Sequence, residues 1–246
     1  MLIIIMHIPF KRSFNRKNNE LRPITLVPNF YPHGDGSCLV KFGNTQVICA
    51  ATIDEKVPPF LKHTRTGWIT AEYGMLPCSS GERIDREASK GKQSGRTVEI
   101  QRLIGRSLRS VVDLSSLGER QIKIDCDVIQ ADGGTRTASI TGSYVAMVLA
   151  CRKLLKQQVI SINPVKAHAV AISCGLINNV PMLDLDYNED SNAEVDSNFI
   201  MSDNNIIEIQ ACGEKHPFSE EVFSILLEYA KKARVELISK QDEALK

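Results

Sequence analysis

The sequence lacks the cysteine patterns that mark a zinc site or a disulfide-stabilised fold. Its seven cysteines lie far apart, no two of them have the two-residue spacing of a metal site, and no histidines cluster beside them. They are Cys38, Cys49, Cys78, Cys126, Cys151, Cys174 and Cys212. Small buried side chains in a reducing compartment explain this pattern better, so we expect a cytoplasmic protein.

The apolar start of the chain is too short to anchor the protein in a membrane. The run from Leu2 to Met6 is far below the ~20 residues that span a bilayer. Basic residues follow this run, which is the reverse of a secretory signal. We therefore expect no membrane contact, and we interpret residues 1–21 as an N-terminal extension before a single domain at 22–246. The sequence leaves open whether Met1 or Met6 is the first residue.

The chain also has little net charge. Its 30 Lys and Arg and 29 Asp and Glu leave a formal charge of +1, which excludes a uniformly basic nucleic-acid coat but not a local basic patch. Residues 83–109 carry eight basic and three acidic side chains, whereas residues 184–208 carry eight acidic side chains and no Lys or Arg. The sequence therefore contains two blocks of opposite charge.

Hydrophobic patterning predicts an α+β fold in which helices cover mixed sheets. Strands are expected at 37–42, 45–53, 121–129, 167–177, 180–186 and 206–211. Helices are expected at 97–113, at 138–155, where apolar residues lie nearly all round, and from an N-cap at Ser219 towards Glu243. Residues 77–95 offer little to bury, so we expect this basic loop to bind a partner or to move.

A glycine-rich turn, QADGGTRTASITG at 130–142, leads from a strand into the buried helix. Gly134 allows the backbone amides to approach a ligand. The helix N-terminus adds unpaired N–H groups and a partial positive charge. Arg136 supplies a planar fork that suits phosphate oxygens. These features together predict an anion site, although the spacing matches neither a P-loop nor a dinucleotide-binding turn.

Two interpretations of this turn remain open from the local chemistry. In one, it is a tight connection in which Thr135 or Thr137 caps the helix. In the other, it binds phosphate together with Arg96, which follows a glycine at the start of the 97–113 helix. Two Gly-Arg helix entries in one chain favour the second interpretation.

Acidic residues follow the predicted strand 180–186. Carboxylates such as Asp184 and Asp190 can hold a divalent metal ion or exchange protons during phosphoryl transfer. In an extended chain these two residues are ~20 Å apart, so joint action requires a bend around Asn188. The alternative is an acidic strand end that is only solvated.

Long segments of the chain resemble the ribonuclease PH family of phosphate-dependent exoribonucleases. The matching stretches are GWITAEYGMLP (67–77), REASKGKQSGRTVEIQRLIGRSLR (86–109), DCDVIQADGGTRTASITG (125–142) and LDLDYNEDSNAEVDSN (183–198). The resemblance runs from about Arg22 to the last helix. It implies a duplicated βαβα-type fold, a hexameric ring built as a trimer of dimers, and removal of nucleotides from tRNA 3′ ends.

The resemblance also implies roles for individual residues. Inorganic phosphate is expected at Arg96, Gly134, Thr135 and Arg136. Asp184 and Asp190 are expected to be the catalytic pair and the Mg²⁺ ligands.

RNA is expected to contact Arg83 and Arg86 in the basic loop, and Arg109 on the helix that follows. Cys78 stands where an arginine is common in the family, so the loop has one positive charge fewer.

Two other function classes compete with phosphorolysis. The first is a non-catalytic RNA-binding ring subunit of the exosome-core type, which should have lost the phosphate arginines or the acidic pair. The second is a hydrolytic nuclease that uses metal-bound water and gives Arg96 and Arg136 no purpose. The presence of both groups of residues favours the phosphorolytic enzyme.

Overall fold

Two β-sheets organise residues 11–246, the part of the chain that the computed structural model describes. The first sheet has the strand order β1-β2-β3-β5-β4, and the second has the order β7-β6-β8-β9. The strands of the first sheet are β1 (Ile24–Pro28), β2 (Gly36–Phe42), β3 (Thr45–Asp54), β4 (Trp68–Met75) and β5 (Gln121–Gln130). Those of the second are β6 (Val170–Ile177), β7 (Val180–Leu183), β8 (Val195–Met201) and β9 (Ile206–Gly213).

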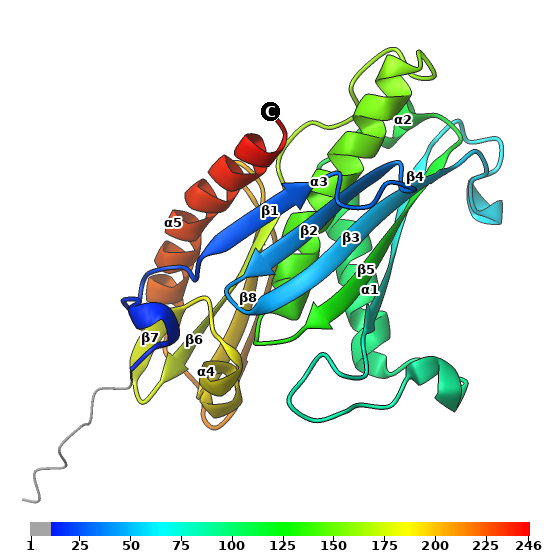
Figure 1. Cartoon of the computed structure of the whole chain (residues 1–246). Coiled ribbons are helices and arrows are strands. Elements are labelled where there is room, and N and C mark those ends of the chain that lie inside the picture. The colour runs from blue at the N-terminus through cyan, green and yellow to red at the C-terminus, as the bar shows by residue number, and fades with distance from the viewer. Residues whose placement is uncertain (1–10) are drawn as a thin grey trace, which may run out of the picture.

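Three longer helices and two short ones accompany these sheets. They are α1 (Gly95–Arg109), α2 (Leu114–Leu117), α3 (Thr135–Lys156), α4 (Tyr187–Asn192) and α5 (Glu220–Ala244). Helix α3 packs against β2 and β3 of the first sheet and against β6 of the second, while α5 contacts β6 and β1 (Figure 1). Helix α3 therefore joins the two halves of the molecule.

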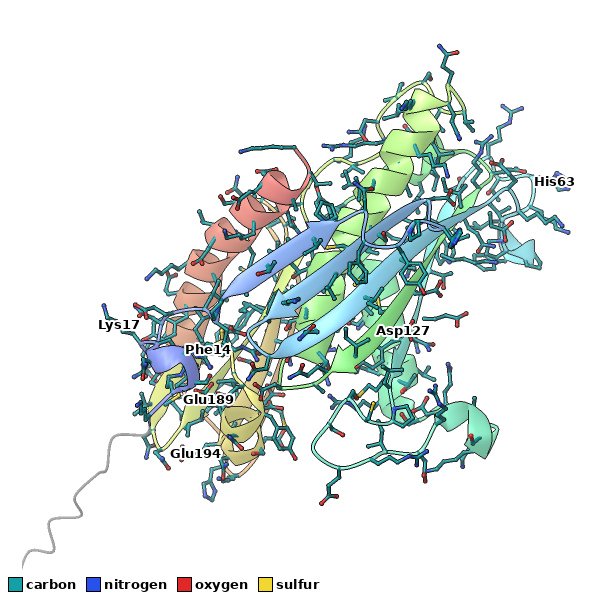
Figure 2. The ribbon with its side chains drawn as sticks, viewed as in Figure 1. Phe14, Lys17, His63, Asp127, Glu189 and Glu194 are labelled. Carbon is teal, nitrogen blue, oxygen red and sulfur yellow. The ribbon has the colours of Figure 1, made fainter. Side chains whose placement is uncertain are left out.

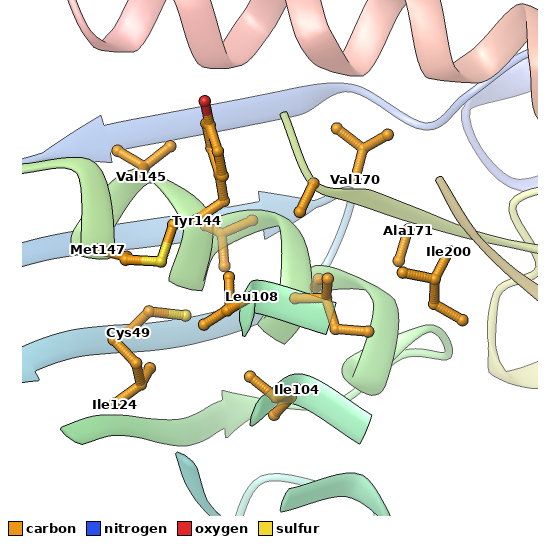
Figure 3. Packing of buried hydrophobic residues seen from close by; sticks show 14 of the residues in the cluster. Cys49, Ile104, Leu108, Ile124, Tyr144, Val145, Met147, Val170, Ala171 and Ile200 are labelled. Atoms are coloured by element: carbon orange, nitrogen blue, oxygen red, sulfur yellow. The ribbon is translucent and has the colours of Figure 1, made fainter. Parts of the chain in front are cut away.

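The position of α3 explains why its sequence is apolar nearly all round. Side chains from both sheets and from α1 surround it and form the main hydrophobic core (Figure 3). By length and composition α3 could cross a membrane, but 78% of its most apolar window is buried inside the fold. It is the central core helix of the domain.

Parallel pairing of β4 and β5 determines where α1 and α3 begin. These two strands are the parallel neighbours of the first sheet, and the other pairs in both sheets are antiparallel. Helix α1 follows β4 and helix α3 follows β5. Because parallel strands end at the same edge of a sheet, both helices start at that edge, where α/β proteins commonly bind ligands.

The structure confirms the predicted α+β class and most of the predicted elements. Three strands were not anticipated, namely β1, β4 and β8. The predicted strand 180–186 is wrong at its end, because β7 stops at Leu183 and Asp184 has a left-handed backbone with φ of 56°. Asp186 instead caps the short helix α4, so the chain bends sharply after β7.

The residues interpreted as an N-terminal extension divide into two parts. The apolar run 2–6 lies outside the described residues. Arg12 and Arg16 are buried, and both contact residues more than 160 positions away in the sequence. The described part of the extension is therefore packed into the fold.

Close packing between α3 and β2 requires a glycine at position 36. A Cβ atom at this residue would collide with the backbone oxygen of Ala146 and lie 2.8 Å from the backbone nitrogen of Ala150. Neither backbone atom can move without shifting the core helix.

We predict that Gly36→Ala lowers the free energy of unfolding by about 1–3 kcal/mol, the usual cost of overpacking. Gly81→Ala is the matched control, because a Cβ atom there meets nothing within 4 Å. Urea unfolding followed by the fluorescence of the single tryptophan measures both. Equal stability of the two variants would contradict the packing argument.

Candidate active site

The turn between β5 and α3 presents uncapped backbone amides. Gly133 and Gly134 have left-handed backbones, with φ of 73° and 67°. Gly134 is the N-cap of α3, and no side chain caps this helix end. Thr137 donates its hydroxyl proton to the carbonyl of Gly134 instead. The interpretation in which a threonine caps the helix is therefore wrong, and no side chain occupies the amides at the start of α3.

The same turn packs directly on the segment that leads to α4. A Cβ atom on Gly133 would lie 2.5 Å from the carbonyl oxygen of Leu185 and 2.6 Å from the carbonyl carbon of Asp186. Only glycine permits this backbone-to-backbone contact. The contact brings the turn from the first half of the chain against the acidic segment of the second half.

The two predicted phosphate arginines lie at the same edge of the first sheet. Arg96 is exposed in the first turn of α1, which Ser94 caps. Arg136 is in the first turn of α3, and its Nη1 donates to Oε1 of Gln210 over 2.9 Å and lies 3.7 Å from Oε2 of Glu99. The charges of Arg96 and Arg136 both lower the pKa of the same two carboxyl groups.

Those carboxyl groups are Asp190 on α4 and Asp196 on β8. Loss of surrounding water raises the pKa of Asp190, and Arg96 and Arg136 only partly offset this effect. Burial, and then the negative charge of Asp190, raise the pKa of Asp196 to about 6. Two carboxyl groups whose pKa values are both raised by burial, beside two arginines, form a site suited to a cation or to proton transfer.

The sequence does not single out Asp196 as a site residue, because its spacing does not distinguish it from the other acidic residues of this block. It follows Asp190 by six residues, and Asp190 follows Asp184 by the same interval. The only indication was that it belongs to the acidic block at 184–208. Tyr73 was also missed; its hydroxyl donates to Oγ1 of Thr135 over 2.9 Å and thereby supports the start of α3.

The structure places Asp184 away from solvent and pairs it with Arg22. Asp184 is 0% exposed, and its Oδ1 accepts a bond of 2.7 Å from Nη2 of Arg22. Its Oδ2 accepts from the backbone nitrogen and from Nε of the same arginine. Burial alone would raise the pKa of Asp184, but the charge and hydrogen bonds of Arg22 lower it. The expectation that Asp184 is a catalytic group or Mg²⁺ ligand is therefore corrected, since its oxygens are already occupied.

The three predicted RNA-binding arginines are separated from one another. Arg83 and Arg86 are exposed in the loop after β4, which projects from the body of the domain (Figure 1). Arg109 lies thirteen residues after Arg96 in the sequence, ~20 Å along α1. Its guanidinium stacks 4.2 Å from the ring centre of Trp68 and donates to the carbonyl of Ile69. This packing revises the expectation that Arg109 contacts RNA, because the residue lies far from Arg96 along α1 and its guanidinium is already bound.

Asp190 and Asp196 offer carboxylate oxygens as ligands for a metal ion. Within residues 11–246 no three His, Cys, Asp or Glu side chains are arranged to enclose one. Mg²⁺ usually binds one or two carboxylates together with substrate phosphates and water. Asp190 and Asp196 beside two arginines fit that mode of binding.

Comparison with known proteins identifies the family. Residues 20–153 match domain 1 of the 3′ exoribonuclease family, and residues 168–233 match domain 2. Ribonuclease PH of Neisseria meningitidis serogroup C and that of serogroup A are each 57% identical to this chain over 232 residues, which cover 94% of this chain and 96% of the relative.

Solved structures share the fold at lower identity. Rice (Oryza sativa) Rrp46 has a TM-score of 0.77 and 20% identity, covering 96% of this chain and 100% of that one. The Archaeoglobus fulgidus exosome with RNA bound to the active site has a TM-score of 0.79 and 21% identity, covering 94% and 92%.

The chain belongs to the 3′ exoribonuclease family. The sequence prediction of a phosphorolytic 3′ exoribonuclease of the ribonuclease PH kind is confirmed by this similarity.

We predict that Asp184→Asn destabilises the fold, because it leaves Arg22 buried without its counter-charge. The loss at pH 7 should be about 3–5 kcal/mol, the usual cost of breaking a buried pair. The folded-state pKa of Asp184 is lowered, so its stabilisation is present above the unfolded pKa of about 3.9 and is lost as pH falls through the folded value. The difference between wild type and variant, measured by urea unfolding, should therefore shrink at acidic pH. Asp190→Asn, which removes a carboxyl of raised pKa, should not destabilise at pH 7.

We also predict that Asp190→Asn lowers the pKa of Asp196, because it removes the nearby negative charge. Arg136→Ala should raise that pKa, because it removes a positive charge. Carboxyl NMR titration of the metal-free protein measures both changes. Shifts of the opposite sign would show that these groups are not neighbours in solution.

Proposed function

We propose that this protein is a phosphate-dependent 3′-to-5′ exoribonuclease that trims tRNA 3′ ends and releases nucleoside diphosphates. One observation carries this proposal. Arg96 and Arg136 lie close enough to both Asp190 and Asp196 for their positive charges to lower the pKa of each carboxyl group. An anion-binding pair beside an acidic pair suits a reaction in which one phosphate attacks another. The relatives named ribonuclease PH support the same reaction.

The arginines and the glycine turn hold the attacking phosphate. Arg96 and Arg136 neutralise its charge, and the amides of Gly134 and Thr135 at the start of α3 donate to its oxygens. A phosphate oxygen attacks the phosphorus of the last phosphodiester, and the bond from that phosphorus to the 3′ oxygen of the preceding nucleotide breaks. The 3′ oxygen takes a proton, and the terminal nucleotide leaves as a diphosphate. The protein contributes mainly positioning and charge neutralisation.

Asp190 and Asp196 are the residues that would hold Mg²⁺. The ion would supply charge neutralisation for the phosphate oxygens. A carboxyl whose pKa is about 6, as at Asp196, is also able to carry a proton near neutral pH. Asp196 replaces the buried Asp184 in this assignment.

The basic loop is proposed to bind the RNA strand. Arg83 and Arg86 are exposed there, and contacts of this kind with phosphates weaken as salt increases. We further propose a cytoplasmic enzyme that assembles as a hexamer, a trimer of dimers, which sedimentation would test.

A non-catalytic ring subunit remains the second candidate, because the A. fulgidus structure with a similar fold is an exosome. This chain retains both arginines and an acidic pair, which a purely structural subunit does not need. The catalytic function is therefore better supported.

One assay distinguishes these functions. A 3′-tailed tRNA is incubated with Mg²⁺, with and without inorganic phosphate, and the released nucleotide is identified. Diphosphates that appear only with phosphate support phosphorolysis. Monophosphates without phosphate would instead indicate hydrolysis, and no release would favour the non-catalytic subunit.

We predict that Arg136→Ala raises the KM for phosphate about 10- to 100-fold, as expected for loss of a charged hydrogen bond worth about 1.5–3 kcal/mol. Arg102→Ala, which removes an exposed arginine from α1, is the matched control and should change this KM less than twofold. Asp190→Ala should mainly abolish turnover. Initial rates at varied phosphate measure all three, and full activity of both site variants would remove the assignment.

A further inference from the structure

Helix α4 buries no hydrophobic side chain of its own, although Leu185 before it and Ala193 after it belong to a small hydrophobic cluster. It is six residues long, and its one buried residue is Glu189. So short a helix is not stable on its own. The flanking residues fix the ends of α4, and between them the only buried anchor is Glu189, which Figure 2 labels. The position of Asp190, the next residue, therefore depends on what binds Glu189.

Two arginines from the beginning of the chain bind Glu189. Nε and Nη2 of Arg12 donate to its two oxygens over 2.7 and 2.9 Å, and Nη2 of Arg16 donates to Oε2 over 2.6 Å. Oε2 also accepts the backbone N–H of Asp186, which closes the capping box at the start of α4. The side chains of Arg12, Arg16 and Glu189 are 1%, 3% and 0% exposed. Such charge-assisted bonds in a dry environment fix one geometry.

The same arginines hold the bend that precedes α4. Nη2 of Arg12 donates to the carbonyl of Leu183 over 2.6 Å, and Nη1 of Arg16 donates to the carbonyl of Asp184. Asp184 has the positive φ that starts the bend. Figure 1 shows the N-terminal turn beside β7 and α4, where these contacts lie.

A third arginine connects this network to the glycine turn. Arg22 pairs with Asp184 and also donates to the carbonyl of Asp132. The buried charges balance, since Arg12, Arg16 and Arg22 face Asp184, Asp186 and Glu189. One N-terminal segment thus contacts both the phosphate turn and the acidic helix.

We propose that Arg12 and Arg16 are positioning residues which, through Glu189, fix Asp190 for metal binding and turnover. This inference rests on the proposed function. Both arginines precede residue 20, where the match to family domain 1 begins. A chain that contains only the matched regions would retain the arginines and carboxylates of the active site but lack the groups that orient Asp190.

The test compares Arg16→Ala and Glu189→Gln with wild type in the full chain. Glu189→Gln preserves shape but removes the charge that both arginines bind. Lys17→Ala is the control, because Lys17 is adjacent and its side chain is 81% exposed. Three quantities are measured: kcat, the KM for phosphate, and Mn²⁺ affinity by electron paramagnetic resonance without RNA. Circular dichroism checks folding at 25 °C.

The expected result is a kcat lowered about 10- to 100-fold and a Mn²⁺ affinity weakened several-fold, as when residues that orient metal ligands are changed, with the KM for phosphate within about threefold of wild type. The KM for phosphate should change little, because Arg96 and Arg136 lie on other helices. Guanidinium at millimolar concentration should restore part of the activity of Arg16→Ala but not that of Glu189→Gln.

Three results would overturn the inference. The first is a folded variant with unchanged kcat, and the second is a lowered kcat with unchanged Mn²⁺ affinity. The third is loss of folding in both variants, which would mean that the network only stabilises the domain. Failure of the proposed function is recognised separately, since wild type itself would then release no diphosphate.

Discussion

The buried pair of Arg22 and Asp184 is the interaction on which the rest of the site depends. It joins the start of β1, the bend after β7 and the glycine turn before α3 in one contact region. A buried ion pair of this kind adds little net stability compared with a hydrophobic contact, because its desolvation cost is high. Its contribution is geometric, since the pair can be satisfied in only one arrangement of these three segments.

The candidate active site combines groups from both halves of the chain. The arginines come from helices that follow the parallel strands β4 and β5, so the topology of the first sheet brings them together. The carboxylates come from α4 and β8 in the second half. Helix α3 contacts both sheets, and the close approach of Gly133 to Leu185 sets the separation of the two groups.

The sequence predicted where the helices of this candidate site begin better than it predicted which acidic residues face them. Arg96 and Arg136 stand at helix starts, and local patterning identifies helix starts well. The acidic residues 184, 190 and 196 are evenly spaced, so their roles depend on which of them faces an arginine from elsewhere. That arginine is Arg22, more than 160 residues away, and no local pattern reveals such a contact. For the same reason Arg12 and Arg16 looked like part of an extension.

The long separation between partners has a consequence for how the enzyme is made. Arg12 and Glu189 are 177 residues apart, and Arg22 and Asp184 are 162 apart. At ordinary translation speed, roughly 8–30 s pass between the synthesis of Arg22 and that of Asp184. During this interval the nascent chain carries its basic segment without the acids that neutralise it. A chain interrupted before residue 184 therefore holds Arg12, Arg16 and Arg22 without the carboxylates that they bind in the completed fold.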